Sequence, residues 1–492
     1  MEYRIKGLQP EALFRFFEDI SAIPRGSHNE KAISDYLVSF AKERGLWVNQ
    51  DAANNVIIKK PASAGAENTA PVMLQGHLDM VCEKLAGVEH DFETEGLDLI
   101  VEDGVLRANG TTLGGDNGAA VALMMTVLDD DSLRHPPLEC VFTVCEEVGL
   151  DGAKALDKSQ LDSRTMINLD SEEEGVATVS CAGGMRYALV RPAQREEAHG
   201  FPVSLEISGL LGGHSGSDIH KERRNGVKLM ARVLRHLTAG KDCRLMAFDG
   251  GSKDNAIPRE CSASVLYLNR EEAQKALEKA QELGKALAEE ILPTEPSFVF
   301  TAAPGEEQDC QVLTPQAGQA LVNAACLAPN GVRVRNPKQG NFVVTSLNLG
   351  VVRSAGERLE LVFAPRSSVE SLQEETEETL ALLAETFGFT TEITGRYPGW
   401  AYAEHSPIRD VFCESYKTLF GGELSIEAIH AGLECGLFSE ALPGLDAIAV
   451  GPTIRGCHTP DEHLPLDSFT RFYQLLTDVL ARLAEKIGRA HV

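Results

Sequence analysis

The first 180 residues alternate short apolar runs with amphipathic segments, and this alternation constrains the fold more than any other feature of the chain. The apolar runs are rich in β-branched or sulfur-containing residues and are bounded by Gly, Pro or Asp, which indicates buried strands. Strands are predicted at residues 56–58, 72–74, 138–144 and 166–169, and helices at residues 10–20, 29–44 and 117–128. The alternation predicts an α/β domain built around a sheet.

The pattern changes near residue 183 and changes back near residue 395. Between these points the chain has longer alternating strands and polar helices, which is typical of an α+β domain. The predicted strands are residues 203–208, 264–268, 342–349 and 360–363, and the predicted helices include residues 271–290 and 368–386. After residue 395 the first pattern returns, with a buried strand at residues 448–450 and a closing amphipathic helix at residues 466–487.

Composition excludes several classes of protein. The 492 residues carry 46 Lys and Arg against 73 Asp and Glu, a formal charge of −27. Nucleic acids and anionic membranes require a basic face, so neither is an expected partner. The most apolar stretch, residues 119–128, is far shorter than a membrane helix, and the first residues lack a signal-peptide pattern. We expect a cytoplasmic protein whose eleven cysteines, which include no C-x-x-C pair, are buried free thiols.

Residue types that bind metals stand at the ends of apolar runs in four segments of the first domain. The segments are VMLQGHLDM with His77 and Asp79, GTTLGGDNGAA with Asp116, VFTVCEEVGLDGA with Glu146 and Glu147, and MINLDSEEEG with Asp170. The carboxyl ends of strands are where α/β sheets place their sites. A single Asp at such a position is more often a helix cap or a turn residue, so only the coincidence of four segments favours a site.

Carboxylates gathered at one edge of a sheet repel each other unless cations neutralise them. The combination of imidazole and carboxylates suits zinc, manganese or cobalt and does not distinguish among them. Two divalent ions, ~3.5–4 Å apart, activate water and stabilise the charge that develops on an attacked carbonyl. The sequence therefore predicts a two-metal hydrolytic site in which Glu146 is free to act as a base.

The same segments, in order along the chain, carry a resemblance to a known family. QGHLDMV, GTTLGGDNG, EEVGLDGA and NLDSEEEG resemble successive motifs of the aminoacyl-histidine dipeptidases (cytosol non-specific dipeptidase, peptidase D), in the carnosinase/aminoacylase clan of dinuclear metallo-exopeptidases. GGHSGSDIHKERRNG, DNAIPRE, FAPRSS, HAGLECGLF and GPTIRGCHTPDE continue the resemblance to about residue 465. It implies a zinc-exopeptidase-like catalytic domain, with a central mixed sheet flanked by helices, and an inserted α+β lid.

The resemblance also implies the roles of individual residues in the catalytic domain. His77 and Asp170 would hold one metal ion, Glu147 and His458 the other, and Asp116 would bridge both ions, which are expected to be zinc, with manganese or cobalt as alternatives. Asp79 would orient His77 by a hydrogen bond. Glu146 would be the general base. The peptide bond between Asp116 and Asn117 would be cis.

For the lid, the resemblance implies residues that contact the substrate. His214 would stabilise the tetrahedral oxyanion, with Asn255 assisting it, and Arg366 would bind the terminal carboxylate of the substrate. Glu434 is the candidate for binding the substrate's ammonium group, with a structural role as the alternative.

The implied site also predicts how the domains connect. Because Asp170 and His458 would serve one site, the lid must be an insertion, so we expect the catalytic domain at residues 1–183 and 396–492 and the lid at residues 184–395. A lid of this length could hold two α+β halves and supply His214 to the active site of its own chain. The resemblance implies small dipeptide substrates and leaves a homodimer open.

The expected activity is hydrolysis of Xaa-His and other unblocked dipeptides by a metal-activated water. The nearest alternative is another specificity within the clan, a tripeptidase or an N-acyl amino acid deacylase. An alternative of a different class is a catalytically silent metal-binding scaffold, which the intact set of acidic and imidazole residues disfavours. A serine hydrolase is disfavoured because no G-x-S-x-G segment occurs.

Overall fold

The computed structural model describes residues 3–338 and 340–485, which form two compact units. Of the described residues, those within Met1–Ser180, Trp400–Ala428 and Leu433–Val492 form the first unit, and those within Cys181–Gly399 and Ile429–Gly432 form the second. The return of Ile429–Gly432 to the second unit was not predicted. The predicted end of the last helix at residue 487 lies outside the described residues.

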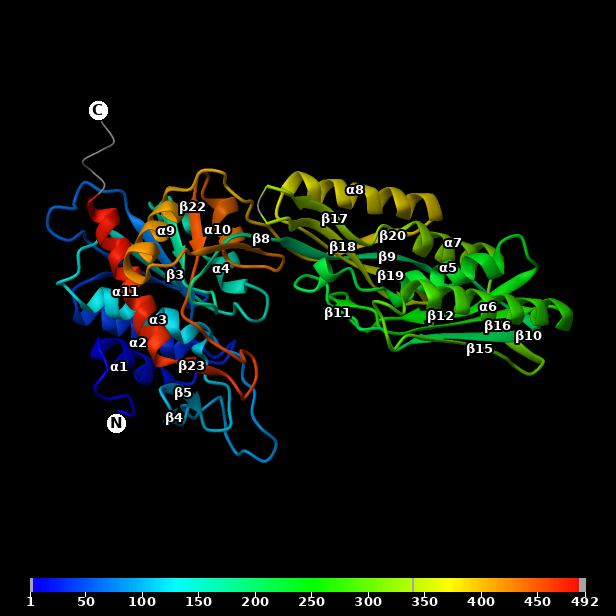
Figure 1. Ribbon diagram of the computed structural model, residues 1–492, viewed down its shortest axis with the longest axis horizontal. Coiled ribbons are helices and arrows are strands. Elements are labelled where there is room, and N and C mark those ends of the chain that lie inside the picture. Colours follow the sequence, from blue (N-terminus) through cyan, green and yellow to red (C-terminus); the bar gives the residue numbers. More distant parts are fainter. Residues whose placement is uncertain (1–2, 339, 486–492) are drawn as a thin grey trace. The chain divides into compact units, whose positions relative to one another are not determined.

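The first unit is built on an eight-stranded mixed sheet (Figure 1). Its strands, in spatial order, are β1 (Trp47–Gln50), β2 (Val56–Lys60), β6 (Leu138–Thr143), β3 (Val72–His77), β7 (Thr165–Asn168), β22 (Asp446–Ala449), β8 (Val176–Cys181) and β21 (Ser425–Ile429). The central strands β6, β3, β7 and β22 run parallel to one another. All six residues of β3 are buried, because a parallel strand in the middle of such a sheet is covered on both faces.

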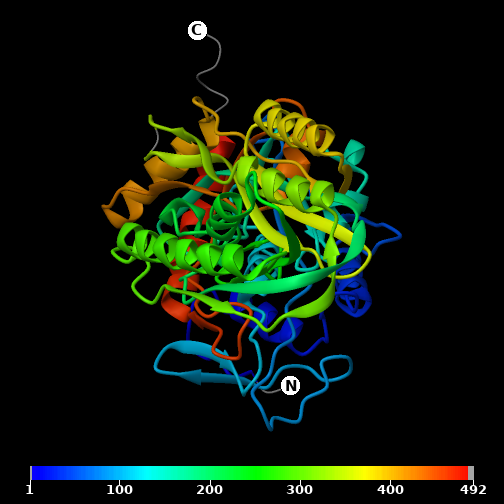
Figure 2. The ribbon, with the colours of Figure 1, turned by 90° about the vertical axis from the view of Figure 1, so that its right-hand side faces the viewer.

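Helices cover this sheet and complete the core of the first unit. They include α1 (Glu11–Ser21), α2 (Lys31–Glu43), α3 (Gly115–Asp129), α4 (Asp151–Ala155), α9 (Pro407–Phe420), α10 (Cys435–Ala441) and α11 (Leu466–Glu485). The first and last of these, α1 in blue and α11 in red, both belong to this unit (Figure 2). Helix α3 is apolar around its whole circumference because it packs against α1, α11 and β3.

A small antiparallel sheet also belongs to the first unit and was not predicted. Its strands are β23 (His463–Pro465), β5 (Val105–Ala108) and β4 (Leu99–Glu102). These strands are short and partly exposed, so they lack the long apolar runs that mark the central sheet.

The second unit is an α+β fold made of two similar halves. The first half runs β10 (Arg195–Ser208), α5 (Gly226–Thr238), β12 (Cys243–Gly250), β14 (Cys261–Tyr267), α6 (Arg270–Ile291) and β15 (Val299–Pro304). The second half combines β9 (Gly183–Pro192) with α7 (Pro315–Leu327), β18 (Phe342–Arg353), β19 (Arg358–Ser367), α8 (Glu370–Phe387) and β20 (Thr390–Tyr397). Each half therefore has the order strand, helix, two strands, helix, strand.

The two halves join into one antiparallel sheet. The spatial order is β15-β10-β14-β12 in the first half and β18-β19-β9-β20 in the second, and β12 pairs with β18 through Gly250 and Val352. Two shorter strands, β16 (Gln308–Leu313) and β17 (Gly331–Asn336), add to β10 and β18. Side chains from all four helices of the two halves pack into one core on the same face of the sheet. The prediction of an α/β fold with an inserted α+β lid is confirmed.

The cysteines were predicted to be buried, and this is correct for only part of them. All eleven lie among the described residues and are free of disulfide bonds there. Five are buried, namely Cys140, Cys181, Cys243, Cys261 and Cys435, whereas Cys82 is exposed and the others are partly exposed. The prediction failed because the number of cysteines and the absence of C-x-x-C pairs carry no information on burial. In the described part of the chain, every helix is too short or too polar to cross a membrane.

Candidate metal centre and active site

The parallel strands of the first unit bring the acidic and imidazole residues to one edge of the sheet. His77 is the last residue of β3 and is paired with Thr143, the last residue of β6, so Glu146 and Glu147 follow at the same edge. Strand β7 pairs with β3 in parallel and ends just before Asp170. Because all three strands end at this edge, their polar continuations converge there.

Asp116 lies between two histidines that are distant in the sequence. Its Oδ1 atom is 3.1 Å from His77 Nε2, and its Oδ2 atom is 3.3 Å from His458 Nε2. Asp170 Oδ1 lies 3.4 Å from the same nitrogen of His77. Glu147 lies 3.1 Å from the same nitrogen of His458. The carboxylate of Asp116 is therefore shared by two clusters of potential metal ligands, one around His77 and the other around His458.

The two groups fit two metal ions. His77, Asp116 and Asp170 offer ligand atoms that all lie within 4.8 Å of one another, and Asp116, Glu147 and His458 do the same. Two ligand atoms bound ~2.0–2.1 Å from one tetrahedral zinc ion are about 3.3 Å apart, and the measured separations agree with this value. The donor set and its spacing therefore suit a pair of divalent ions with Asp116 between them.

Asp79 holds the segment that carries both glutamates. Its carboxylate accepts hydrogen bonds from the backbone amides of Glu146 at 3.0 Å and Glu147 at 3.2 Å. His77 Nδ1 lies 3.1 Å from the backbone carbonyl oxygen of Asp79 and 3.4 Å from its carboxylate. Asp79 thus lies against His77 Nδ1 through its carbonyl oxygen and its carboxylate, and its role in orienting His77 stays a prediction. The hydrogen bonds of its carboxylate to the backbone of the predicted base were not predicted.

Asn117 links two of the segments and was missed in the sequence. It follows Asp116 through a cis peptide bond, as the family resemblance implied. Its Oδ1 atom accepts a hydrogen bond from the amide of His77 at 3.1 Å, and its Nδ2 atom donates to the carbonyl oxygen of Leu169 at 2.8 Å. The sequence signal that could have identified Asn117 is its position directly after Asp116, the predicted bridging ligand.

The charges of the cluster shift the pKa of its members. Burial lowers the pKa of His77, but Asp170 and Asp116 outweigh this and raise that pKa well above its ordinary value. Hydrogen bonds to Asp116 and Glu147 raise the pKa of His458 to about 11. Burial raises the pKa of Glu146 well above the ordinary value of a carboxyl group. The carboxylates stabilise the positively charged form of both histidines, and the same negative potential would stabilise bound cations.

In the second unit, a two-stranded ladder places His214 beside Asn255. Strands β11 (Gly213–His214) and β13 (Ala256–Ile257) pair, and the amide of Ser215 donates to the carbonyl oxygen of Asn255 at 2.8 Å. His214 Nδ1 accepts hydrogen bonds from the backbone amides at residues 216 and 217, at 3.2 and 3.1 Å. Because Nδ1 is an acceptor, the ring proton of neutral His214 is assigned to Nε2. Burial and the charge of Arg366 lower the pKa of His214, which favours this neutral form.

Arg366 lies in a small pocket of the second unit together with Asn255. The pocket has a volume of about 240 Å³, and its lining also includes Arg186 and Tyr397. Arg366 is only 8% exposed and donates a hydrogen bond to the Tyr397 hydroxyl at 2.9 Å, while its Nε atom has no partner among the described residues. Tyr397 was not predicted, because a tyrosine at a strand end has no distinctive sequence signal.

Glu434 is completely buried in the first unit. Thr143 donates a hydrogen bond to its Oε2 atom at 2.8 Å, and the side-chain amide of Gln75 donates to the same oxygen. Its Oε1 atom has no hydrogen-bond partner among the described residues. Burial raises the pKa of Glu434 to about 7.

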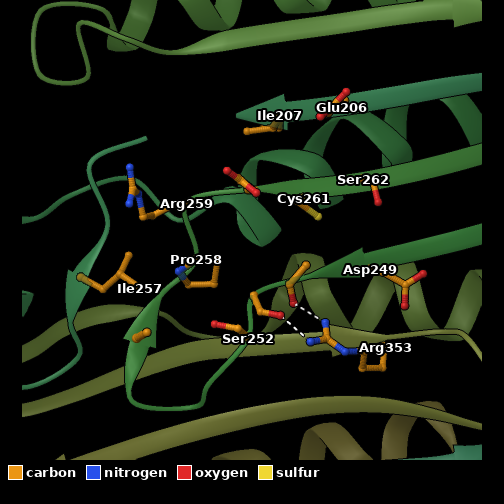
Figure 3. Close-up of a pocket in the computed structure, with 14 residues that line it drawn as sticks. Glu206, Ile207, Asp249, Ser252, Ile257, Pro258, Arg259, Cys261, Ser262 and Arg353 are labelled. Carbon is orange, nitrogen blue, oxygen red and sulfur yellow. Dashed lines mark hydrogen bonds between the residues drawn. The ribbon is translucent and has the colours of Figure 1, made fainter. Parts of the chain in front are cut away.

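A larger pocket of the second unit is separate from these residues. Its volume is about 510 Å³, and it is lined by the ends of β10 and β12, the hairpin that follows β12, and Arg353 (Figure 3). Arg353 donates to the backbone carbonyl oxygens of Gly250 and Gly251. The lining includes neither Asn255 nor Arg366, although the hairpin at residues 251–260 carries Asn255.

Residues 73–482 match the profile of the Peptidase family M20/M25/M40. The cytosol non-specific dipeptidase of Escherichia coli (strain K12) is 37% identical over 483 residues, which span 97% of this chain and 99% of that protein. The chain therefore belongs to the Peptidase family M20/M25/M40.

Solved structures agree with this assignment. The aminoacylhistidine dipeptidase from Vibrio alginolyticus matches with a TM-score of 0.91 and 37% identity over 96% of this chain and 97% of that one. A tripeptidase from Staphylococcus aureus, at 16% identity and a TM-score of 0.54 over 97% of this chain and 99% of that one, shares the fold. The family resemblance drawn from the ordered motifs is confirmed.

Proposed function

We propose that the chain is a cytoplasmic, metal-dependent dipeptidase that hydrolyses Xaa-His and other unblocked dipeptides. The observation that carries this proposal is the position of Asp116, which has one oxygen atom near each of two histidines. The names of the relatives from Escherichia coli and Vibrio alginolyticus support the substrate class, and the former supports the compartment.

The proposed centre holds two divalent ions, with zinc as the favoured metal and manganese or cobalt as alternatives. His77 and Asp170 would bind one ion, Glu147 and His458 the other, and Asp116 both. When bound, the ions polarise a water molecule and stabilise negative charge on the carbonyl oxygen of the substrate. The donor atoms and their 3.1–3.4 Å separations support this assignment.

Glu146 is the proposed general base. Its side chain is next to the cluster, with Oε2 4.0 Å from His77 Nε2, and its backbone is held by Asp79. The carboxylate would take a proton from the attacking water and deliver it to the amine that leaves.

His214 is the proposed donor to the oxyanion of the tetrahedral intermediate, with Asn255 assisting it. A neutral imidazole with its proton on Nε2 can donate a hydrogen bond to an oxyanion without first changing its protonation state. The two amides that donate to Nδ1 support this tautomer. Lid closure would bring these groups to the substrate and exclude water.

Arg366 is the proposed partner of the substrate's terminal carboxylate, and its replacement gives a testable result. We expect Arg366→Met to raise KM for dipeptides about 10–100-fold, because a charge-assisted hydrogen bond is worth ~1.5–3 kcal/mol. Arg366→Lys should recover part of the loss, since lysine keeps the charge but not the two-pronged geometry. Arg333→Met, at an exposed position of the second unit, is the control. An unchanged KM in Arg366→Met would remove this role.

Glu434 is the proposed partner of the substrate's ammonium group, through its unpartnered Oε1 atom.

The experiment that tests the dipeptidase proposal compares hydrolysis of Ala-His with hydrolysis of N-acetyl-Ala-His. Loss of activity on acetylation is the expected result. A preference for the acetylated compound would indicate a deacylase, preferential cleavage of tripeptides would indicate a tripeptidase, and absence of any hydrolysis would indicate a silent scaffold.

We further propose that His214 acts on the active site of its own chain, whether or not the protein is a homodimer. To test this, equal amounts of the His214→Ala and Glu146→Gln chains are unfolded, mixed and refolded together. If His214 acts within its own chain, the mixture should stay as inactive as either variant. Recovery of about a quarter of the wild-type activity would show exchange between chains, because half the dimers would be mixed and each would hold one intact site.

A further inference from the structure

The loop that carries Asp116 is held by a buried carboxylate, Glu462. This side chain is 2% exposed. Its Oε2 atom accepts hydrogen bonds from the amides of Leu113 and Gly114, each at 2.8 Å, and its Oε1 atom accepts one from the amide of Asp116 at 3.1 Å. Three backbone donors of one loop therefore converge on a single side chain from 346 to 349 positions further along the chain.

Glu462 belongs to the same closed loop as His458. Arg455 and His463 exchange backbone hydrogen bonds at 3.0 and 2.9 Å, which closes the base of this loop. Within it, the amide of Glu462 donates to the carbonyl oxygen of Thr459 at 3.0 Å. The carboxylate that accepts the amides of the Asp116 loop and the imidazole that faces Asp116 Oδ2 therefore belong to one loop closed by backbone hydrogen bonds.

The opposite side of the Asp116 loop is held by another buried charge. Arg25 is 2% exposed and donates to the carbonyl oxygens of Gly114 at 2.5 Å and Leu78 at 3.0 Å. This contact ties the Asp116 loop to the segment after His77, just as Glu462 ties it to the segment of His458. The His77 side also has a second tie, the Asn117 side chain.

We propose that Glu462 is a positioning residue that sets the separation of Asp116 and His458, and thereby the affinity for the ion shared by Asp116, Glu147 and His458. This inference rests on the proposed two-metal centre. When Glu462 is replaced, the hydrogen bonds of Arg25 and Asn117 still hold the Asp116 loop against the segment of His77. The ion bound by His77 and Asp170 should therefore be affected less than the ion bound by Glu147 and His458. Residues that orient metal ligands without binding the metal typically change affinity 10–100-fold when replaced.

Titration of the chelated full-length chain with Co²⁺, in competition with a chromophoric chelator, tests the inference without measuring activity. The wild-type chain should bind two ions. Glu462→Gln, which can no longer accept all three amide hydrogen bonds, should bind one ion with affinity within about threefold of wild type and the other about 10–100-fold more weakly. In a His458→Ala background, Glu462→Gln should leave the remaining ion unaffected.

Glu18→Gln is the matched control. Glu18 is 3% exposed, and its carboxylate also accepts hydrogen bonds from backbone amides, those of Arg4 at 2.7 Å and Ile5 at 2.8 Å. It should lower the unfolding temperature without changing Co²⁺ binding. Glu462→Asp, which keeps the charge on a shorter side chain, should show an intermediate weakening of the same ion and provides the test if the glutamine variant does not fold.

The inference is overturned if Glu462→Gln binds both ions as the wild type does, or if both ions weaken equally. It is also overturned if the weakening by Glu462→Gln persists for the ion that remains in the His458→Ala background. A wild-type chain that binds no Co²⁺ would instead refute the proposed metal centre, and the two failures are therefore distinguishable.

Discussion

Glu146→Gln is expected to lower kcat for Ala-His about 10³-fold while both metal ions stay bound. Glutamine has nearly the same shape as glutamate but cannot take a proton from the attacking water, and general-base catalysis typically contributes 10²–10⁴-fold. The ligands are unchanged, and Asp79 still accepts the backbone amide of residue 146. Steady-state kinetics and metal analysis of the same purified sample measure both quantities.

The control for this variant is Glu102→Gln, an exposed glutamate at the end of β4 in the same unit. It should have wild-type kcat and metal content. A fully active Glu146→Gln enzyme would remove Glu146 from the mechanism, whereas an inactive variant that had lost its ions would assign Glu146 to metal binding.

Asp116→Ala is expected to abolish tight binding of both ions and to lower activity about 10⁴-fold or more, because the ions supply several kcal/mol of stabilisation to the developing charge. The reason is geometric: the two oxygen atoms of Asp116 lie 3.1 Å from His77 and 3.3 Å from His458. Metal content after dialysis and activity at a fixed metal concentration are the measurements.

Two single replacements serve as graded comparisons for Asp116→Ala. His77→Ala and His458→Ala should each weaken one ion and spare the other, because His77 is assigned to the ion shared with Asp170 and His458 to the ion shared with Glu147. Retention of two tightly bound ions by Asp116→Ala would exclude it as the bridging ligand.

The central sheet of the first unit could be predicted because its strands are continuous apolar runs with polar ends. The predicted strands at residues 72–74 and 138–144 correspond to β3 and β6, which are buried on both faces. The strands β4, β5 and β23 could not be predicted in this way, because they are short and partly exposed. Strands β4 and β5 pair locally, but β23 joins β5 from more than 350 positions away, as in the pair of Leu106 with Leu464.

The candidate ligands could be named from the sequence, but their arrangement could not. A histidine or carboxylate at the end of an apolar run is a local signal, whereas the approach of His458 to Asp116 joins residues 342 positions apart. The family resemblance supplied that long-range pairing, and the parallel register of β3, β6 and β7 explains why the segments of His77, Glu146 and Asp170 converge.

The supporting residues were missed for a different reason. Asn117, Arg25 and Glu462 act on backbone amides and carbonyl groups, and any backbone segment offers these groups. Their roles therefore depend on how loops approach one another, and the residue types alone do not indicate them. The carboxylate of Asp79 is similar, because its bonds to the amides of Glu146 and Glu147 are visible only once β3 and β6 are adjacent.

The most direct test of the account measures metal content per chain together with Ala-His hydrolysis, before and after chelation. We expect two divalent ions per active chain, loss of hydrolysis when a chelator removes them, and recovery when Zn²⁺, Mn²⁺ or Co²⁺ is restored. Undiminished hydrolysis by a chain from which all metal has been removed would contradict the account.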